Sequence, residues 1–312
     1  MSHRQQDDVP RADTLAAWWG LIKASVTGWS DDYAPSMGAA LAYYSVFSLA
    51  PLLWIVIAIA GLAFGSQAAS GEVFSQLRGL LGDEPAKVVQ DVLLSLSKPE
   101  RGLPSTIVGI VVLLIGATSA FGELQNALDR IWRAPRPATR GGLWNLVHSR
   151  LLSFGMILCI AFLLVVSLVL SAAISALGKW WATAFGDWEL LLQAVNFVVG
   201  FAMTTFVFGM IYKLMPRVRV HWHDVWLGAA ITSALFTLGR TLIGLYIGKT
   251  AVASGFGAAG ALAVIFVWVY YSAQIFLLGA EFTWVYAKTY GSMREVVAAL
   301  PPTQPMRTGV PR

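Results

Sequence analysis

The chain has 312 residues and a formal net charge of +5, with 57% hydrophobic and only 12% charged residues. Soluble domains carry roughly 25% charged residues, so this composition excludes an ordinary soluble fold. The lone cysteine, Cys159, excludes a disulfide framework and a thiolate metal site.

A short helix is predicted before the first long apolar run. Leu15, Trp18, Trp19, Ile22 and Val26 recur at helical spacing and would form one apolar face. An amphipathic helix of this kind is typical of the membrane interface. We therefore expect residues 1–36 to form a cytoplasmic segment that contains an interfacial helix.

Six runs with few or no charged residues follow, and a membrane-spanning helix needs about 20 such residues. We predict an all-α, polytopic membrane protein with six transmembrane helices over residues 37–288, an extracytoplasmic loop at 66–103 with two short amphipathic helices, and a disordered cytoplasmic tail at 289–312. The six runs are Met37–Phe64, Gly102–Gly122, Leu151–Gly178, Leu190–Tyr212, Val225–Gly248 and Thr250–Glu281.

Lys and Arg residues predict the orientation, because basic residues are retained in cytoplasmic loops. With both termini inside, 15 of the 22 basic residues are cytoplasmic, 6 are outside, and Arg240 lies within a span. We therefore expect both termini in the cytoplasm. The positive net charge then reflects topology, and no nucleic-acid partner is needed to explain it.

Polar residues within the predicted spans indicate an interior that holds water or a polar group. In chain order, the candidate substrate-binding residues are Tyr43, Tyr44, Glu123, Asn126, Asn196, Arg240, Gln274 and Glu281. Glu123 and Asn126 share one helical face, as do Gln274 and Glu281.

Arg240 is the most informative of these residues, because it lies in the middle of the apolar run Val225–Gly248. An ionised side chain at a helix centre costs roughly 2.5 to 3.5 kcal/mol on insertion scales. Its guanidinium group suits a phosphate or carboxylate, which predicts an anionic substrate. A structural ion pair with Glu123 or Glu281 that fixes helix register is the alternative, and the sequence leaves both open.

The segment His221-Trp222-His223-Asp224 invites a metal site, but side chains two apart on a helix face in different directions. No third ligand is evident nearby, so we predict no metal and expect these residues to cap a helix. The sequence has no G-x-x-x-x-G-K-[ST] loop and no G-x-S-x-G motif. We expect no cofactor and no enzymatic activity.

Three stretches resemble the YihY/BrkB family of bacterial inner-membrane proteins. They are Ala39–Leu52, Phe121–Trp132 and Gly257–Glu281, within a resemblance that covers roughly residues 15–290. The resemblance implies six spans and a location in the bacterial inner membrane. Members of the family have been associated with serum resistance and proposed as transporters, including of lipid-linked envelope components. Some carry an old label as a tRNA-processing ribonuclease, but this chain lacks the His/Asp cluster of a metal-dependent nuclease.

Taken together, these patterns predict a transporter or lipid translocase for an anionic or amphipathic envelope molecule. Its expected partners are membrane lipids and an anionic or lipid-linked cargo, and no nucleic acid. The alternative function is a non-transporting membrane scaffold that maintains the envelope, with the Arg-rich segment Arg130–Arg140 as its docking surface.

Overall fold

The computed structural model describes residues 15–48, 70–71, 74, 90, 116, 119–135, 189–218, 220–249 and 252–294. These residues form helices joined by turns, with no strand among them, which confirms the all-α class. The expected third span and almost all of the loop 66–103 lie outside the described residues, so the count of six spans stays a prediction.

Three long helices confirm the last three predicted spans. They are α7 (Glu189–Leu214), α8 (Trp222–Lys249) and α9 (Val252–Thr289). Within them, Phe197–Leu214, Trp222–Ile243 and Leu262–Thr289 are long and apolar enough to cross a membrane. At 1.5 Å per residue α9 is about 57 Å long, well beyond a hydrocarbon core of about 30 Å.

The N-terminal part of the chain forms two helices at an angle. Helix α1 (Leu15–Asp31) is followed by a turn at Tyr33, which has a positive φ of 59°, and by a helix over residues 34–48. The predicted helix at Leu15 is thus confirmed. Its apolar residues Leu15, Trp19, Ile22 and Val26 are exposed, whereas Trp18 stacks on Phe282 of α9 with ring centroids 6.3 Å apart.

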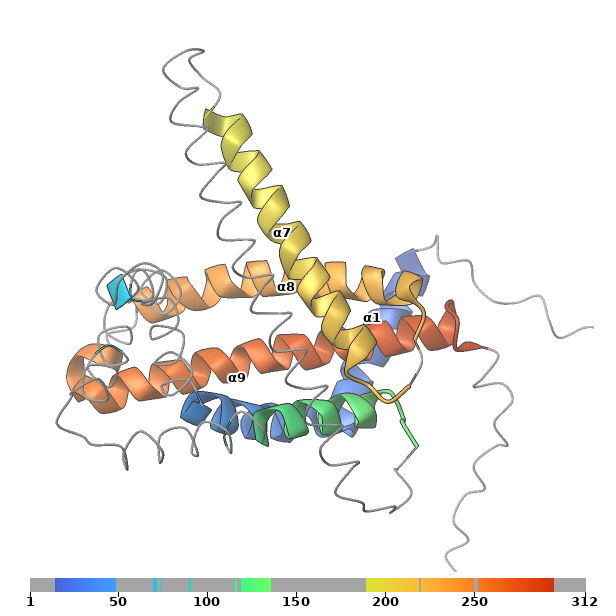
Figure 1. Ribbon diagram of the computed structural model, residues 1–312, viewed down its shortest axis with the longest axis horizontal. Helices are drawn as coiled ribbons and strands as arrows, with labels where there is room; N and C mark the ends of the chain where they lie inside the picture. Colours follow the sequence, from blue (N-terminus) through green and yellow to red (C-terminus); the bar gives the residue numbers. More distant parts are fainter. Residues whose placement is uncertain are drawn as a thin grey trace, which may run out of the picture.

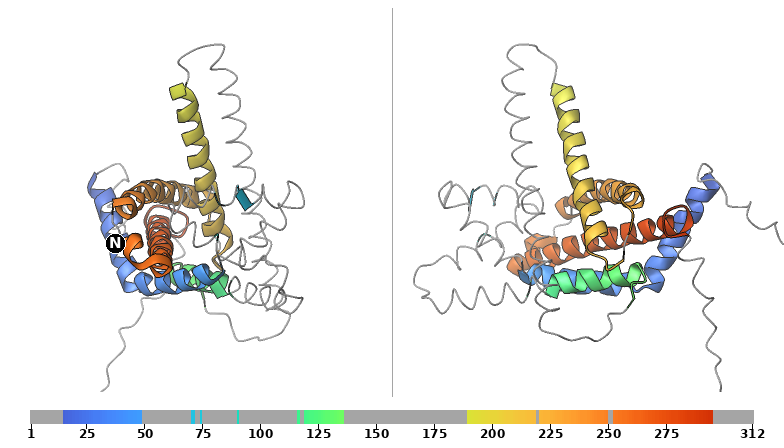
Figure 2. Two further views of the ribbon diagram at one scale, coloured as in Figure 1. Left: turned by 90° about the vertical axis from the view of Figure 1, so that its left-hand side faces the viewer. Right: turned by 45° about the vertical axis from the view of Figure 1, so that its right-hand side comes forward.

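Helix α9 is the centre of the arrangement. Figure 1 shows α8 alongside it on one side, with the 34–48 helix and the short helix over residues 119–131 on the other. Both views in Figure 2 keep these neighbours in place and show α7 leaving the group at a steep angle. Helix α1 also packs on α9, and α7 packs on α8.

Glycines bring α8 and α9 into close, antiparallel contact. A Cβ atom at Gly228 would lie 1.8 Å from Thr283 Oγ1, and one at Gly279 would lie 2.0 Å from Thr232 Oγ1. Further along, a Cβ at Gly239 would lie 2.5 Å from Ile275 Cδ1. Small residues at such positions let helix backbones approach within a membrane. These contacts also fix the register of the two helices.

Four segments distant in sequence meet at one end of the helices. Trp132 packs edge-on against Trp284 with centroids 5.7 Å apart, which joins the 119–131 helix to α9. Asp224, in the first turn of α8, accepts hydrogen bonds from the backbone N–H and the hydroxyl of Ser292 at 2.9 and 2.6 Å. Ser292, which falls in the tail predicted over 289–312, is therefore held against α8, and the rest of that tail from residue 295 lies outside the described residues.

Candidate functional site

Two buried carboxyl groups lie close together at this end of the helices. Glu281 of α9 is 1% exposed and Asp32, in the turn after α1, is 4% exposed. Both pack around Gly28 of α1: a Cβ atom there would lie 2.8 Å from Glu281 Oε2, and the Asp32 backbone N–H donates to the Gly28 carbonyl at 2.9 Å. With Arg130 and Arg133 they form what we call the Asp32–Glu281 cluster.

The two arginines approach the cluster from the end of the 119–131 helix. Arg133 Nη1 donates to Asp32 Oδ1 at 2.5 Å, and Arg130 Nε lies 3.8 Å from the same oxygen. Arg130 also lies over the ring of Tyr33, with 5.1 Å from its guanidinium carbon to the centroid. Both arginines are about half exposed, so the cluster is buried on its acidic side and open on its basic side.

Arg133 occupies a backbone position where glycine is usual. Its φ is 51°, its N–H donates to the carbonyl of Arg130, and the Ala134 N–H donates to the carbonyl of Asp129. This is the Schellman pattern that ends a helix, with Arg133 as its left-handed residue. Since a left-handed arginine is less stable than a glycine there, the ion pair with Asp32 accounts for its presence.

A second ion pair stands beside the cluster. Asp129 accepts the Arg217 backbone N–H at 2.8 Å, and its other oxygen lies 3.2 Å from Arg217 Nη1. Burial raises the pKa of Asp129, while the N–H and the guanidinium of Arg217 act in the opposite direction. The contact connects the 119–131 helix to the segment that joins α7 and α8.

Arg240 lies on α8 away from this cluster. Its side chain is exposed, and no ion pair or hydrogen bond links it to another described residue. In the α8–α9 register, Gly279 lies opposite Thr232 and Gly239 lies opposite Tyr271. Arg240 is therefore about ten residues, or about 15 Å, from the level of Glu281.

Tyr43 and Glu123 lie nearer to the level of Arg240. Gly38 meets Gln274 of α9, so Tyr43, five residues further, is level with the region of Tyr271. Glu123 is half-buried and nine residues, or about 13 Å, along its helix from Trp132, which touches Trp284. This puts Glu123 within about one helical turn of the Arg240 level, on the opposite side of α9 from α8.

The other predicted residues are scattered. Tyr44 contacts the Tyr43 ring edge-on at 5.3 Å, and Asn126 is exposed. Gln274 donates weakly to the carbonyls of Ala34 and Pro35, both at 3.5 Å, and its buried Oε1 has no described partner. The side chain of Asn196 lies outside the described part of the structure.

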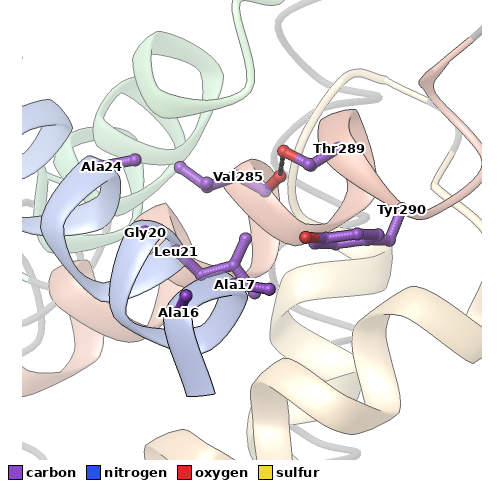
Figure 3. Close-up of a pocket in the computed structure, with 8 residues that line it drawn as sticks. All are labelled: Ala16, Ala17, Gly20, Leu21, Ala24, Val285, Thr289 and Tyr290. Carbon is purple, nitrogen blue, oxygen red and sulfur yellow. Dashed lines mark hydrogen bonds between the residues drawn. The ribbon is translucent and has the colours of Figure 1, made fainter. Parts of the chain in front are cut away.

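A small pocket of about 320 Å³ lies between α1 and the end of α9. Figure 3 shows Leu21 and the alanines of α1 facing Val285 and Tyr290 across it. The lining is mainly apolar, and it contains none of the residues predicted to bind substrate. Among the described residues, no group of three or more His, Cys, Asp or Glu side chains could hold a metal ion.

Asp32 and Tyr212 were not proposed as site residues from the sequence, and Arg133 was considered only as part of the Arg-rich segment Arg130–Arg140. Asp32 and Arg133 form their ion pair only because the end of α1 and the end of the 119–131 helix meet beside α9. Tyr212 of α7 is fully buried, and its hydroxyl donates to the Phe276 carbonyl at 2.7 Å and lies 3.1 Å from Thr232 Oγ1. A tyrosine in an apolar span gives a weak signal, because interfacial tyrosines are common in membrane proteins.

These features define the class: an α-helical membrane protein with several candidate spans and a buried acidic cluster at one end. A family model described as Virulence factor BrkB matches residues 25–299, and the chain belongs to that family. This confirms the resemblance seen in the sequence. No solved structure matches the chain.

Relatives share the description of membrane protein. A UPF0761 membrane protein of Cronobacter sakazakii is 26% identical over 278 residues, which cover 88% of this chain and 89% of the relative. One of Ralstonia nicotianae is 29% identical over 263 residues, covering 80% of this chain and 55% of the relative. One of Alcanivorax borkumensis is 26% identical, with 87% and 60% covered. The chain thus spans only somewhat over half the length of the latter two relatives.

Proposed function

We propose that this protein is a transporter or lipid translocase of the bacterial inner membrane that moves an anionic or amphipathic envelope molecule. Arg240 is its anion-binding residue, and both termini are cytoplasmic. The chain performs no enzymatic step and needs no cofactor or nucleic acid. Family membership supports the membrane location, and the state of Arg240 supports the transport of an anion.

The proposal depends on one observation: Arg240 is exposed within the apolar stretch Trp222–Ile243 and has no ion pair with a described residue. Such a charge in a membrane usually faces a bundle interior or a wet cavity and is paired. The buried Asp32 and the partly buried Asp129 already pair with other arginines. An anion from outside the chain would supply the missing partner.

The position of Arg240 along α8 favours a transport role over a structural one. A register-fixing ion pair needs a carboxylate within about 4 Å, and Glu281 is about 15 Å away along the helix axes. Tyr43 and Glu123 lie near the same level as Arg240. Because they lie across α9 from α8, they would meet the substrate at another point of its path, with Tyr43 as a hydrogen-bond donor and Glu123 as a group that takes up a coupling proton.

The test is flux in proteoliposomes that contain the full chain. Fluorescent anionic and zwitterionic lipids, and small anions, are assayed with the wild type, Arg240→Gln, Arg240→Lys and Thr241→Val. Thr241 is the adjacent exposed residue and serves as the matched control. We expect anionic cargo to move with the wild type and Thr241→Val, to be lost with Arg240→Gln and to be reduced with Arg240→Lys, whose ammonium cannot bind bidentately.

The same assay can contradict the proposal. Equal flux with wild type and Arg240→Gln would remove Arg240 from the mechanism. Flux no higher than in protein-free liposomes, for every cargo and with folded protein, would favour the non-transporting scaffold.

A further inference from the structure

The burial of Asp32 and Glu281 at one junction has a chemical requirement. Two ionised carboxylates can only accept hydrogen bonds, so a hydrogen bond between carboxyl groups needs a proton on one of them. Both carboxyl side chains are almost completely buried, and both residues lie against Gly28, where an added Cβ would be 2.8 Å from Glu281 Oε2 and the carbonyl accepts the Asp32 N–H. Two negative charges held near each other and away from water would repel strongly.

The positive charge at the cluster is unevenly placed. Arg133 and Arg130 both approach Oδ1 of Asp32, and neither makes an ion pair with Glu281. Oδ2 of Asp32 and Oε1 of Glu281 are buried with no hydrogen-bond partner among the described residues. The two arginines therefore compensate mainly Asp32, and among the described residues no cation makes an ion pair with Glu281.

In the part of the chain that the structure describes, the other neighbours of Glu281 add no positive charge. Asp31 contributes a further negative charge from the end of α1. On the α1 side, a Cβ at Gly28 would lie 2.8 Å from Glu281 Oε2, so only a glycine leaves room for the carboxyl. On the α8 side the contact to this part of α9 is between Gly228 and Thr283, which are both uncharged.

We propose that Asp32 and Glu281 share a single proton and form a proton-binding site at the junction of α1, α9 and the end of the 119–131 helix. The ligand is the proton itself, and the site does not depend on the transport of an anion by Arg240. Loss of the proton would place two negative charges against each other in a desolvated junction. The packing of α1 on α9 is then weakened as the pH rises.

The test uses the full chain purified in detergent and the infrared carbonyl band of protonated carboxylic acids near neutral pH. Glu281→Gln and Asp32→Asn remove one member of the pair, and Asp31→Asn removes an exposed acid next to it. We expect the wild type to show the band. It should be lost in Glu281→Gln, which keeps a hydrogen-bond donor to Asp32, and in Asp32→Asn, where Arg133 is free to pair with an ionised Glu281. Asp31→Asn should retain it.

Thermal unfolding gives an independent readout. The midpoint of the wild type should fall from mildly acidic to mildly alkaline pH, because the folded state binds the proton more tightly than the unfolded state. The midpoint of Glu281→Gln should change much less. Absence of the band in the wild type would show that both carboxylates are ionised and would overturn the proposal. A band that persists in folded Glu281→Gln and Asp32→Asn would assign the proton to another acid and would overturn it equally.

Discussion

At the scale of single residues, Arg133 has an unfavourable backbone conformation and a favourable side-chain ion pair. Its left-handed conformation ends the 119–131 helix, and its guanidinium group compensates the buried Asp32. An alanine and a glycine at this position both remove the ion pair, but only glycine relieves the left-handed backbone. The two substitutions therefore separate the two contributions.

We predict that Arg133→Ala lowers the free energy of unfolding by about 1–3 kcal/mol, the usual effect of leaving a buried acceptor without its partner. Arg133→Gly should lower it by roughly 1 kcal/mol less, since a non-glycine left-handed residue costs about 1–2 kcal/mol. Thermal unfolding of the purified protein measures both. Equal midpoints for the two variants would show that the backbone at residue 133 is not strained in the folded protein.

At the scale of helices, the contact between α8 and α9 is set by glycines. Gly279 lies against both Thr232 of α8 and Tyr212 of α7, so that one small residue holds three helices together. The hydroxyl of Tyr212 reaches the α9 backbone only because no side chain stands at this position. A methyl group there would separate the helices or break that hydrogen bond.

We predict that Gly279→Ala lowers the free energy of unfolding by about 1–3 kcal/mol, as overpacking of a close contact typically does. Gly200→Ala in α7 is the matched control, because nothing lies within 4 Å of the added Cβ. That change should be neutral or stabilise by about 0.5–1 kcal/mol, since glycine is unfavourable inside a helix. If both variants unfold at the same temperature, the close packing at Gly279 does not contribute to stability.

The helices could be predicted from the sequence, but their mutual register could not. Apolar length is a local property, so α7, α8 and α9 follow directly from the composition of their segments. Which polar residues meet depends on how far one helix slides along another, and a shift of ten residues separates Arg240 from Glu281. Asp32, which lies with Glu281 beside Gly28, is far away from it in sequence and has no distinctive motif around it.

At the scale of the whole molecule, the contacts at one end constrain the topology. The end of α1, the end of the 119–131 helix, the α7–α8 connection and the residues after α9 meet there through Asp32–Arg133, Asp129–Arg217 and Asp224–Ser292. Segments that touch in this way lie on the same side of a membrane. The excess of Lys and Arg in these four segments predicts that this side is the cytoplasm.

Single cysteines in a Cys159→Ser background test the prediction with a thiol reagent that cannot cross membranes. Each of the four segments is represented by one exposed residue. These are Lys23 in α1, Pro135 after the 119–131 helix, His221 in the α7–α8 connection and Arg294 after α9. We expect cysteines at all four positions to react only after the cells are permeabilised. Lys179→Cys, in the loop between the third and fourth predicted spans that is expected to be outside, should react in intact cells. If the reactivity of all five cysteines were the opposite, the shared end would lie outside the cell. That result would contradict the predicted orientation but not the fold. A split among the four positions would contradict the packing at this end, because segments joined by direct ion pairs and hydrogen bonds cannot lie on opposite sides of a bilayer.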